Sequence, residues 1–168
     1  MENAIAIPNA GLVLLNSYIP LLFERLGLIA NGQFTSITHQ KEAVHYLQYL
    51  VTGLSETEEH LLPLNKILCG LDITAAMPQG MTILTGDKEL MDGLIQAAIG
   101  HWPTIGETSI DGFRSNWLVR EGLLEEQADR WELSVDKRAY DILINQAPFS
   151  FSIIKFPWMP KPLYVNWP

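Results

Sequence analysis

The sequence predicts an α+β fold that is mainly helical, with an N-terminal helical part followed by helices and a small antiparallel sheet. Two patterns indicate this fold class. Apolar residues recur at helical spacing in segments between Gly11 and Leu118, whereas in the C-terminal third they alternate with polar residues, as in half-buried strands. The chain has 168 residues and an apolar content of 48%, which suffices for a substantial core and excludes a disordered tail.

We expect a single domain over residues 1–168, helical over 1–70 and built from helices and the small sheet over 87–168. Residues 71–86 are rich in Thr, Met, Pro and Gly and are typical of a connector. They are therefore the candidate for an internal boundary.

The first predicted helix covers Gly11 to Gly27, where Pro20 should kink it or start a second helical segment. The preceding Asn9-Ala10-Gly11 is typical of a turn or cap, because Asn and Gly tolerate unusual backbone angles. A second helix is predicted from His39 to Thr52, with Thr38 as N-cap and Gly53 as its stop.

Three more helices follow in order. Pro63 to Gly70 has Pro in its first turn and Gly just past its end, and Asp87 to Trp102 is ended by Pro103. Thr108 to Asp111 resembles a capping box, and the helix that it starts should end at Gly122. Arg114 and Arg120 lie off its apolar stripe, so we expect them to form surface ion pairs with nearby carboxylates.

Strands are predicted at three places. Trp131 to Val135 and Leu163 to Trp167 alternate in polarity, and Asp136 is a candidate cap for a short helix from Lys137 to Asn145. From Phe149 to Phe156 the alternation places Phe149, Phe151 and Ile153 on one side, with Ile154 on the other.

Charge and hydropathy exclude two classes of partner. The formal net charge of -8 is shared evenly by the two halves and leaves no basic patch, which argues against nucleic acid and anionic membrane surfaces. The run from Asn3 to Phe23 has the length of a membrane helix, but its Asn residues, Pro8 and Pro20 are incompatible with one. We expect a buried helix there instead.

Cys69 is the single thiol, and no histidine lies in a motif with it. A thiol nucleophile requires a neighbouring base or positive field that lowers its pKa. A small thiol hydrolase that uses Cys69 and one of the histidines is therefore an alternative, and a buried, inert cysteine is the favoured interpretation. The four histidines lack the spacing of a zinc site, so we expect no metal and no cofactor.

The segment from Pro148 to Pro160 combines bulky apolar residues with three prolines. Pro157 and Pro160 forbid a helix and leave Trp158 and Met159 in an extended or turned conformation. Such a segment is either a core strand with a packed turn or a docking strip for a partner.

Several stretches, in order along the chain, resemble the C-terminal region of tape measure proteins from phage-tail-like contractile injection systems. The N-terminal ones are Asn9 to Leu15, Pro20 to Leu28 and Leu64 to Gly70. The later ones are His101-Trp102, Thr108-Ser109, Arg114 to Gly122, Trp131 to Leu133 and Ile153 to Met159. The resemblance spans nearly the whole chain, and no catalytic site is attached to these motifs.

The resemblance implies a structural, non-catalytic component. Proteins of this family are much longer, with an extended portion whose length is thought to set the length of the tube. A rod needs about 1.5 Å of helix per residue, so this chain would be an excised terminal domain, the interpretation we favour, or a short relative. Its expected location is the cytoplasm during assembly and then the injection particle.

The resemblance also implies a mechanism, in which the terminal domain docks on the spike or baseplate end of the assembly or on copies of itself. Expected partners are the baseplate, spike and tube proteins and the chain itself, with no small-molecule substrate. An adaptor or chaperone of the same machine is the alternative within this system. The residues that we expect to contribute to a partner-binding surface are Ile154, Phe156, Trp158, Met159 and Trp167.

Overall fold

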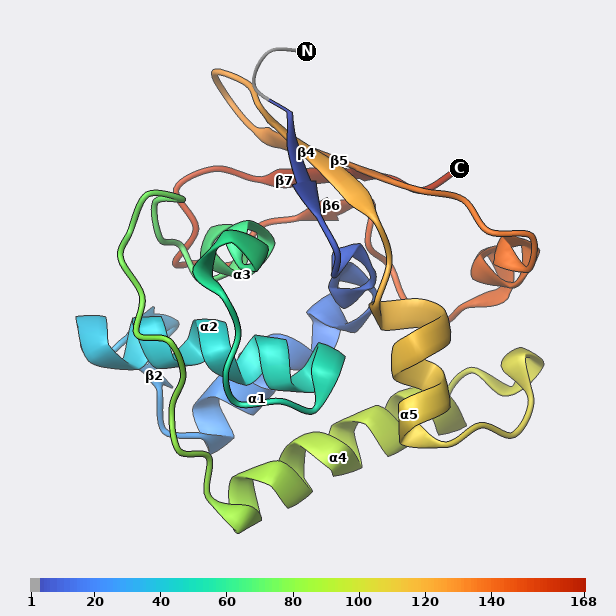
Figure 1. Ribbon diagram of the computed structural model, residues 1–168, viewed down its shortest axis with the longest axis horizontal. Helices are drawn as coiled ribbons and strands as arrows, with labels where there is room; N and C mark the ends of the chain where they lie inside the picture. Colours follow the sequence, from blue (N-terminus) through green and yellow to red (C-terminus); the bar gives the residue numbers. More distant parts are fainter. Residues whose placement is uncertain (1–3) are drawn as a thin grey trace.

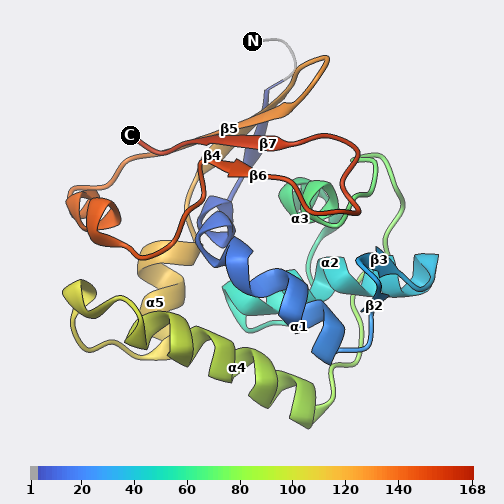
Figure 2. The ribbon, with the colours of Figure 1, turned by 180° about the vertical axis from the view of Figure 1, so that it is seen from behind.

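A computed structural model describes residues 4–168 and places one sheet above a layer of helices (Figures 1 and 2). The helical elements are η1 (Ala10–Tyr18), α1 (Ile19–Arg25), α2 (Ile37–Thr52), η2 (Glu59–Leu61), α3 (Pro63–Leu68), α4 (Thr85–Gly100), η3 (Pro103–Ile105), α5 (Ile110–Phe113), η4 (Arg114–Leu118) and η5 (Asp141–Gln146). The strands are β1 (Ile5–Ile7), β2 (Ile29–Ala30), β3 (Gln33–Phe34), β4 (Gly122–Glu126), β5 (Trp131–Val135), β6 (Ile153–Ile154) and β7 (Leu163–Asn166). The predicted α+β fold class, mainly helical, is confirmed.

The larger sheet has the strand order β1-β4-β5-β7-β6, and β2 pairs with β3 in a separate hairpin. It is mixed and not purely antiparallel, because β7 runs parallel to β5, with Leu133 opposite Val165. The N-terminal part is not wholly helical either, since Ile5–Ile7 forms an edge strand against β4. The segment from Ala4 to Ile7 is short and wholly apolar, so its polarity does not alternate and did not indicate a strand.

The uncharged run from Asn3 to Phe23 forms β1, η1 and α1, with Asn3 itself outside the described residues. Pro20 lies in the first turn of the second of two helical segments, as the sequence predicted, because a proline without an N–H is tolerated there. No helix between Ala4 and Pro168 has both the length and the hydropathy required to cross a bilayer.

Close packing explains why position 11, which the sequence assigned to a turn, is a glycine. A Cβ atom at this position would overlap the carbonyl oxygen of Trp117, so only glycine lets η1 approach η4. The neighbouring Ala10 N–H donates to the Arg120 carbonyl at 2.9 Å, which ties the start of η1 to the segment before β4.

Local signals explain the limits of α2. Ser36, not Thr38, is its N-cap, with the side-chain oxygen accepting from the His39 N–H, and Gly53 ends it in the left-handed conformation at φ 74°. Ser109 caps α5 in the same way, and the helix continues as the π-helical η4 as far as Leu118. The predicted helix end at Gly122 is wrong, because Gly122 is the first residue of β4.

The core lies between the sheet and the helices and draws on both halves of the chain. Its fully buried members include Leu15, Leu47, Ile95 and Leu133. Within it, Asn9, Gln48 and Asn65 bond one another through their side chains and join η1 to α2 and α3.

Candidate docking surfaces

The environment of Cys69 is that of a buried core residue. Its side chain is fully buried, and burial raises the pKa of the thiol well above its usual value. The four histidines are engaged elsewhere: His39 with Thr35, His45 with the Pro78 carbonyl, His60 with Glu58 and His101 with Tyr18. The pair of groups that a thiol hydrolase needs is therefore not assembled around Cys69.

Metal-ligating side chains do not gather at one point in the part of the chain that the structure describes. No group of three or more His, Cys, Asp or Glu residues with the geometry to hold a metal ion occurs between Ala4 and Pro168.

The five residues predicted for partner binding lie mostly in the interior. Ile154, Phe156, Trp158 and Met159 are buried, and only Trp167 is half-buried. In the folded chain the first four side chains pack in the core. A contribution of these residues to a partner contact stays a prediction.

Trp158 is held inside an aromatic cluster. Its ring lies 5.0 to 5.7 Å from those of Phe156, Phe34 and Phe23, and its Nε1–H donates to the Leu68 carbonyl at 2.7 Å. The prolines therefore direct this indole onto the end of α3. Gly70 makes the approach feasible, since any Cβ atom there would overlap the Trp158 carbonyl oxygen.

Trp167 belongs to a second cluster, built around the buried ion pair of Arg120 and Asp141. The guanidinium donates to both carboxylate oxygens, at 2.8 and 2.6 Å, and lies over the rings of Trp117, Tyr140 and Trp167. The surface pairing predicted for Arg120 is thus wrong. The sequence places its partner 21 residues away, beyond the reach of helix-spacing rules.

The pKa of Asp141 reflects two opposing effects. Burial raises it, but hydrogen bonds from Arg120, Trp167 and the Arg138 backbone N–H, together with the charge of Arg120, outweigh burial and keep the pKa below its usual value. The carboxylate is therefore ionised at neutral pH and fixes the end of β7 through Trp167.

The outer face of the sheet, on the side away from the helices, is the first candidate docking surface. Strand alternation exposes Leu123, Ile153 and Tyr164 there, at 44%, 58% and 38% of their surfaces. The register aligns Tyr164 with Ile153 on one side and with Glu132 on the other. We call the surface formed by Ala6, Leu123, Glu125, Glu132, Ser134, Ile153, Tyr164 and Asn166 the outer sheet face.

Carboxylates dominate the charge of this outer sheet face. Glu125 and Glu132 stand opposite each other on β4 and β5, and the exposed Glu121 and Asp136 lie at the end of the same strand pair. The neighbouring cation, Arg130, is already bound to Glu132 at 3.0 Å and lies 4.7 Å from the centre of the Tyr164 ring. A shallow hollow of about 470 Å³ lies over β5, β7 and β6.

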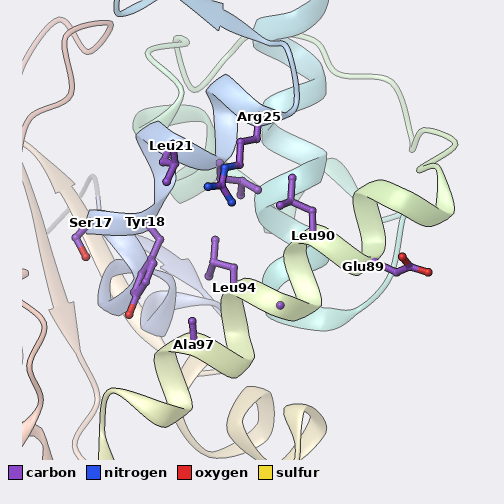
Figure 3. A pocket seen from close by; sticks show the side chains of 10 residues that line it. Ser17, Tyr18, Leu21, Arg25, Glu89, Leu90, Leu94 and Ala97 are labelled. Atoms are coloured by element: carbon purple, nitrogen blue, oxygen red, sulfur yellow. The ribbon is translucent and has the colours of Figure 1, made fainter.

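A groove between α1 and α4 is the second candidate surface (Figure 3). It has a volume of about 410 Å³. Its lining, which we call the α1–α4 groove, consists of Ser17, Tyr18, Leu21, Leu22, Arg25, Glu89, Leu90, Gly93, Leu94 and Ala97. Leu21 is 52% exposed, and Leu90 and Leu94 are only half-buried, so the chain leaves this apolar surface open to solvent.

The comparisons with known proteins give one match. The sequence model of the contractile injection system tape measure protein family matches residues 1–167. The chain belongs to this family. No curated protein and no solved structure matches it.

As a tape measure protein, the chain is a structural component of the injection particle, and its partners are proteins of that assembly. The family match covers the sheet and the helices alike, so both candidate surfaces lie within the part that the tape measure family shares. Sequence reasoning missed both surfaces. Residues 121–125 do not alternate between apolar and polar side chains, and the helix predicted as far as Gly122 overlaps the start of β4, so the outward Leu123 was not recognised.

Proposed function

We propose that this chain is the folded anchor of its tape measure protein, which docks on the spike or baseplate end of the particle while the tube is assembled to length. The supporting observation is the outer sheet face. A sheet packed on one side by helices usually presents a polar second face, yet this face carries Leu123, Ile153 and Tyr164.

Charge defines the partner. The face combines these apolar groups with carboxylates such as Glu125, which has no ion-pair partner among residues 4–168. The complementary surface is therefore apolar with a basic border. A second copy of the same face would bring like charges together, so a different protein of the particle fits better than self-association. The whole chain, at -8, adds a long-range attraction to a basic partner.

The test is co-purification of the full chain with the spike, baseplate and tube proteins of its own system. The variant combines Leu123→Gln with Ile153→Gln, and the matched control is Leu54→Gln, which removes a leucine of 60% exposure elsewhere on the surface. We expect the double variant to lose association with a spike or baseplate protein and the control to keep it.

Two results would contradict the proposal. One is unchanged association of the double variant. The other is a wild-type chain that captures none of these proteins but forms a stable oligomer in light scattering, which would indicate docking on copies of itself. Association that strengthens with added salt would also contradict the role assigned to the carboxylates, because salt screens ionic attraction.

A further inference from the structure

The α1–α4 groove lies at the side of the molecule away from the sheet, so it goes beyond the anchoring surface (Figures 1 and 2). Helix α4 has more apolar surface than the core uses. Met91, Ile95 and Ala98 are buried against the core, whereas Leu90 and Leu94 form a second, half-buried row beside them.

The residues on the two walls of the groove have the spacing that a bound helix requires. Along α4, the lining residues Leu90, Gly93, Leu94 and Ala97 follow the spacing i, i+3, i+4, i+7, and Tyr18, Leu21, Leu22 and Arg25 line the opposite wall with helical spacing. Two facing rows of this kind can accept the side chains of a third helix between them. Tyr18 is held in place by a 2.7 Å hydrogen bond to His101, whose ring stacks on it.

Gly93 has no explanation within the fold. Glycine inside a helix is unfavourable relative to alanine, and a Cβ atom at Gly93 would meet nothing within 4 Å. Its backbone conformation is helical, so a left-handed angle does not require it either. Its effect is to leave the floor of the groove open to a close approach from outside.

Arg25 supplies the charge that defines the occupant. Of the five arginines in the sequence, Arg114, Arg120, Arg130 and Arg138 bond carboxylates or carbonyls of the chain. The side chain of Arg25 makes no hydrogen bond or ion pair with any residue from Ala4 to Pro168. In Figure 3 its side chain reaches over the groove toward Leu94, while Glu89 points away from it.

We propose that the α1–α4 groove binds an amphipathic helix of another protein, whose bulky apolar side chains enter beside Gly93 and whose Asp or Glu pairs with Arg25. An arginine above an apolar groove offers its donors to a carboxylate in a partly water-excluded site, where a charge-assisted hydrogen bond is strong. A second copy would carry the same net charge of -8 and be repelled. An acidic residue on a partner helix would instead pair with Arg25, whose side chain has no partner among residues 4–168.

The experiment titrates the full chain with two fluorescent helical peptides of about 20 residues, a length that permits helix formation in water. Both carry Leu at i, i+3, i+4 and i+7, and they differ only in Glu or Lys beside the Leu row. We expect the Glu peptide to bind about tenfold more tightly than the Lys peptide, as one charged hydrogen bond implies. Arg25→Glu should reverse this order.

Substitution of Gly93 tests the groove itself. Gly93→Gln fills the floor and should abolish binding of the Glu peptide, while its urea midpoint stays at or above that of the wild type, because Gln favours helix over Gly. Gly86→Gln is the matched control, since Gly86 also lies on α4 with open space around it but does not line the groove. It should bind as the wild type does.

The outcomes separate this inference from the anchor proposal. The Leu123→Gln, Ile153→Gln chain should bind the peptide normally, so failure of one surface leaves the other standing. Equal binding of the two peptides, binding by Gly93→Gln, or no binding of either peptide would overturn the inference. So would a wild-type dimer that Gly93→Gln dissociates, because a second copy would then cover the groove.

Discussion

Asp141 accepts hydrogen bonds from two arginine nitrogens, from the Trp167 indole and from the Arg138 backbone inside the protein. Its carboxylate thereby joins the segment after η4 to the end of β7. Burial makes the pair sensitive to the loss of one partner, since the remaining charge has no compensation.

Asp141→Asn should lower the free energy of unfolding by about 3–5 kcal/mol, because it leaves the buried Arg120 guanidinium without its counter-charge. Urea unfolding measures this change. Glu126→Gln is the control: it removes the partner of Lys161 from an exposed pair and should cost less than about 1 kcal/mol. Equal costs for the two variants would contradict the role of burial.

Acid should weaken the buried ion pair of Arg120 and Asp141. The pKa of Asp141 is lower in the folded chain than in the unfolded chain, where it is about 3.9. Its contribution is therefore fully present above that value and is lost as the pH falls through the folded pKa. Urea midpoints at neutral and acidic pH should fall more for the wild type than for Asp141→Asn. Parallel curves would show that Asp141 does not contribute to the acid sensitivity.

Residue-scale rules succeeded where the signal is local. Gly53 was identified as a helix stop from its position after an apolar stripe, and the structure has it in the left-handed conformation that Gly alone adopts without strain. Arg120 could not be placed in this way. Its partner is fixed by how the chain folds back, and helix-spacing rules contain no information about a contact 21 residues away.

At the scale of elements, β6 shows how pairing decides which side chain is buried. The strand has two residues, too few for alternation alone to define its faces. Pairing with β7 puts Ile154 opposite the buried Leu163 and Ile153 opposite the exposed Tyr164. The sequence assigned Ile153 to the same side as the buried Phe149, and the structure reverses that assignment because the ladder starts only at Ile153.

Ile154→Ala should therefore destabilise the chain by about 2–5 kcal/mol, as expected for a truncated core side chain. Ile153→Ala, one residue away, should change the stability by no more than about 0.5 kcal/mol, because it lies on the outer sheet face. Chemical unfolding of both variants compares them directly. A larger cost at Ile153 would mean that the register of β6 on β7 is different.

Helices were predicted better than strands for a physical reason. A helix such as α4 makes its hydrogen bonds within one segment, so its apolar stripe and its end can be recognised from the local sequence. β1 and β4 depend on each other across more than a hundred residues, and neither Ile5–Ile7 nor Gly122–Glu126 alternates between apolar and polar side chains.

For the molecule as a whole, the connector over residues 71–86 is the segment that decides whether the chain unfolds in one step. It is packed against the helices before it: the Met77 N–H donates to Glu59, the Pro78 carbonyl contacts His45, and Ile83 is buried. The core that it adjoins contains residues from both sides.

We therefore predict a single cooperative unfolding transition, in line with the expectation of one domain. Calorimetry should give equal calorimetric and van't Hoff enthalpies. Tryptophan fluorescence offers a second probe, since all the tryptophans lie after the connector, whereas far-UV circular dichroism also reports α2. Two transitions, or midpoints that differ between the probes, would instead place a boundary at 71–86.

The docking residues were beyond sequence reasoning at this scale. A high density of apolar residues next to prolines is a property of Phe156 to Met159 whether they meet a partner or the core, and the aromatic cluster with Phe23 uses them internally. The exposed apolar surfaces are formed by residues such as Leu123 and Leu94. Nothing in the sequence distinguishes these leucines from core leucines, and only the fold shows that they are left uncovered.

The parallel position of β7 has a consequence for the order in which the protein is built. β7 is the last strand along this sequence, yet it occupies an interior place in the sheet, between β5 and β6. Until residues 163–166 have left the ribosome, β6 has no neighbour and one edge of β5 is open to other chains. The sheet can thus close only after its final strand has been synthesised, and the Trp167 contact with Asp141 then secures it.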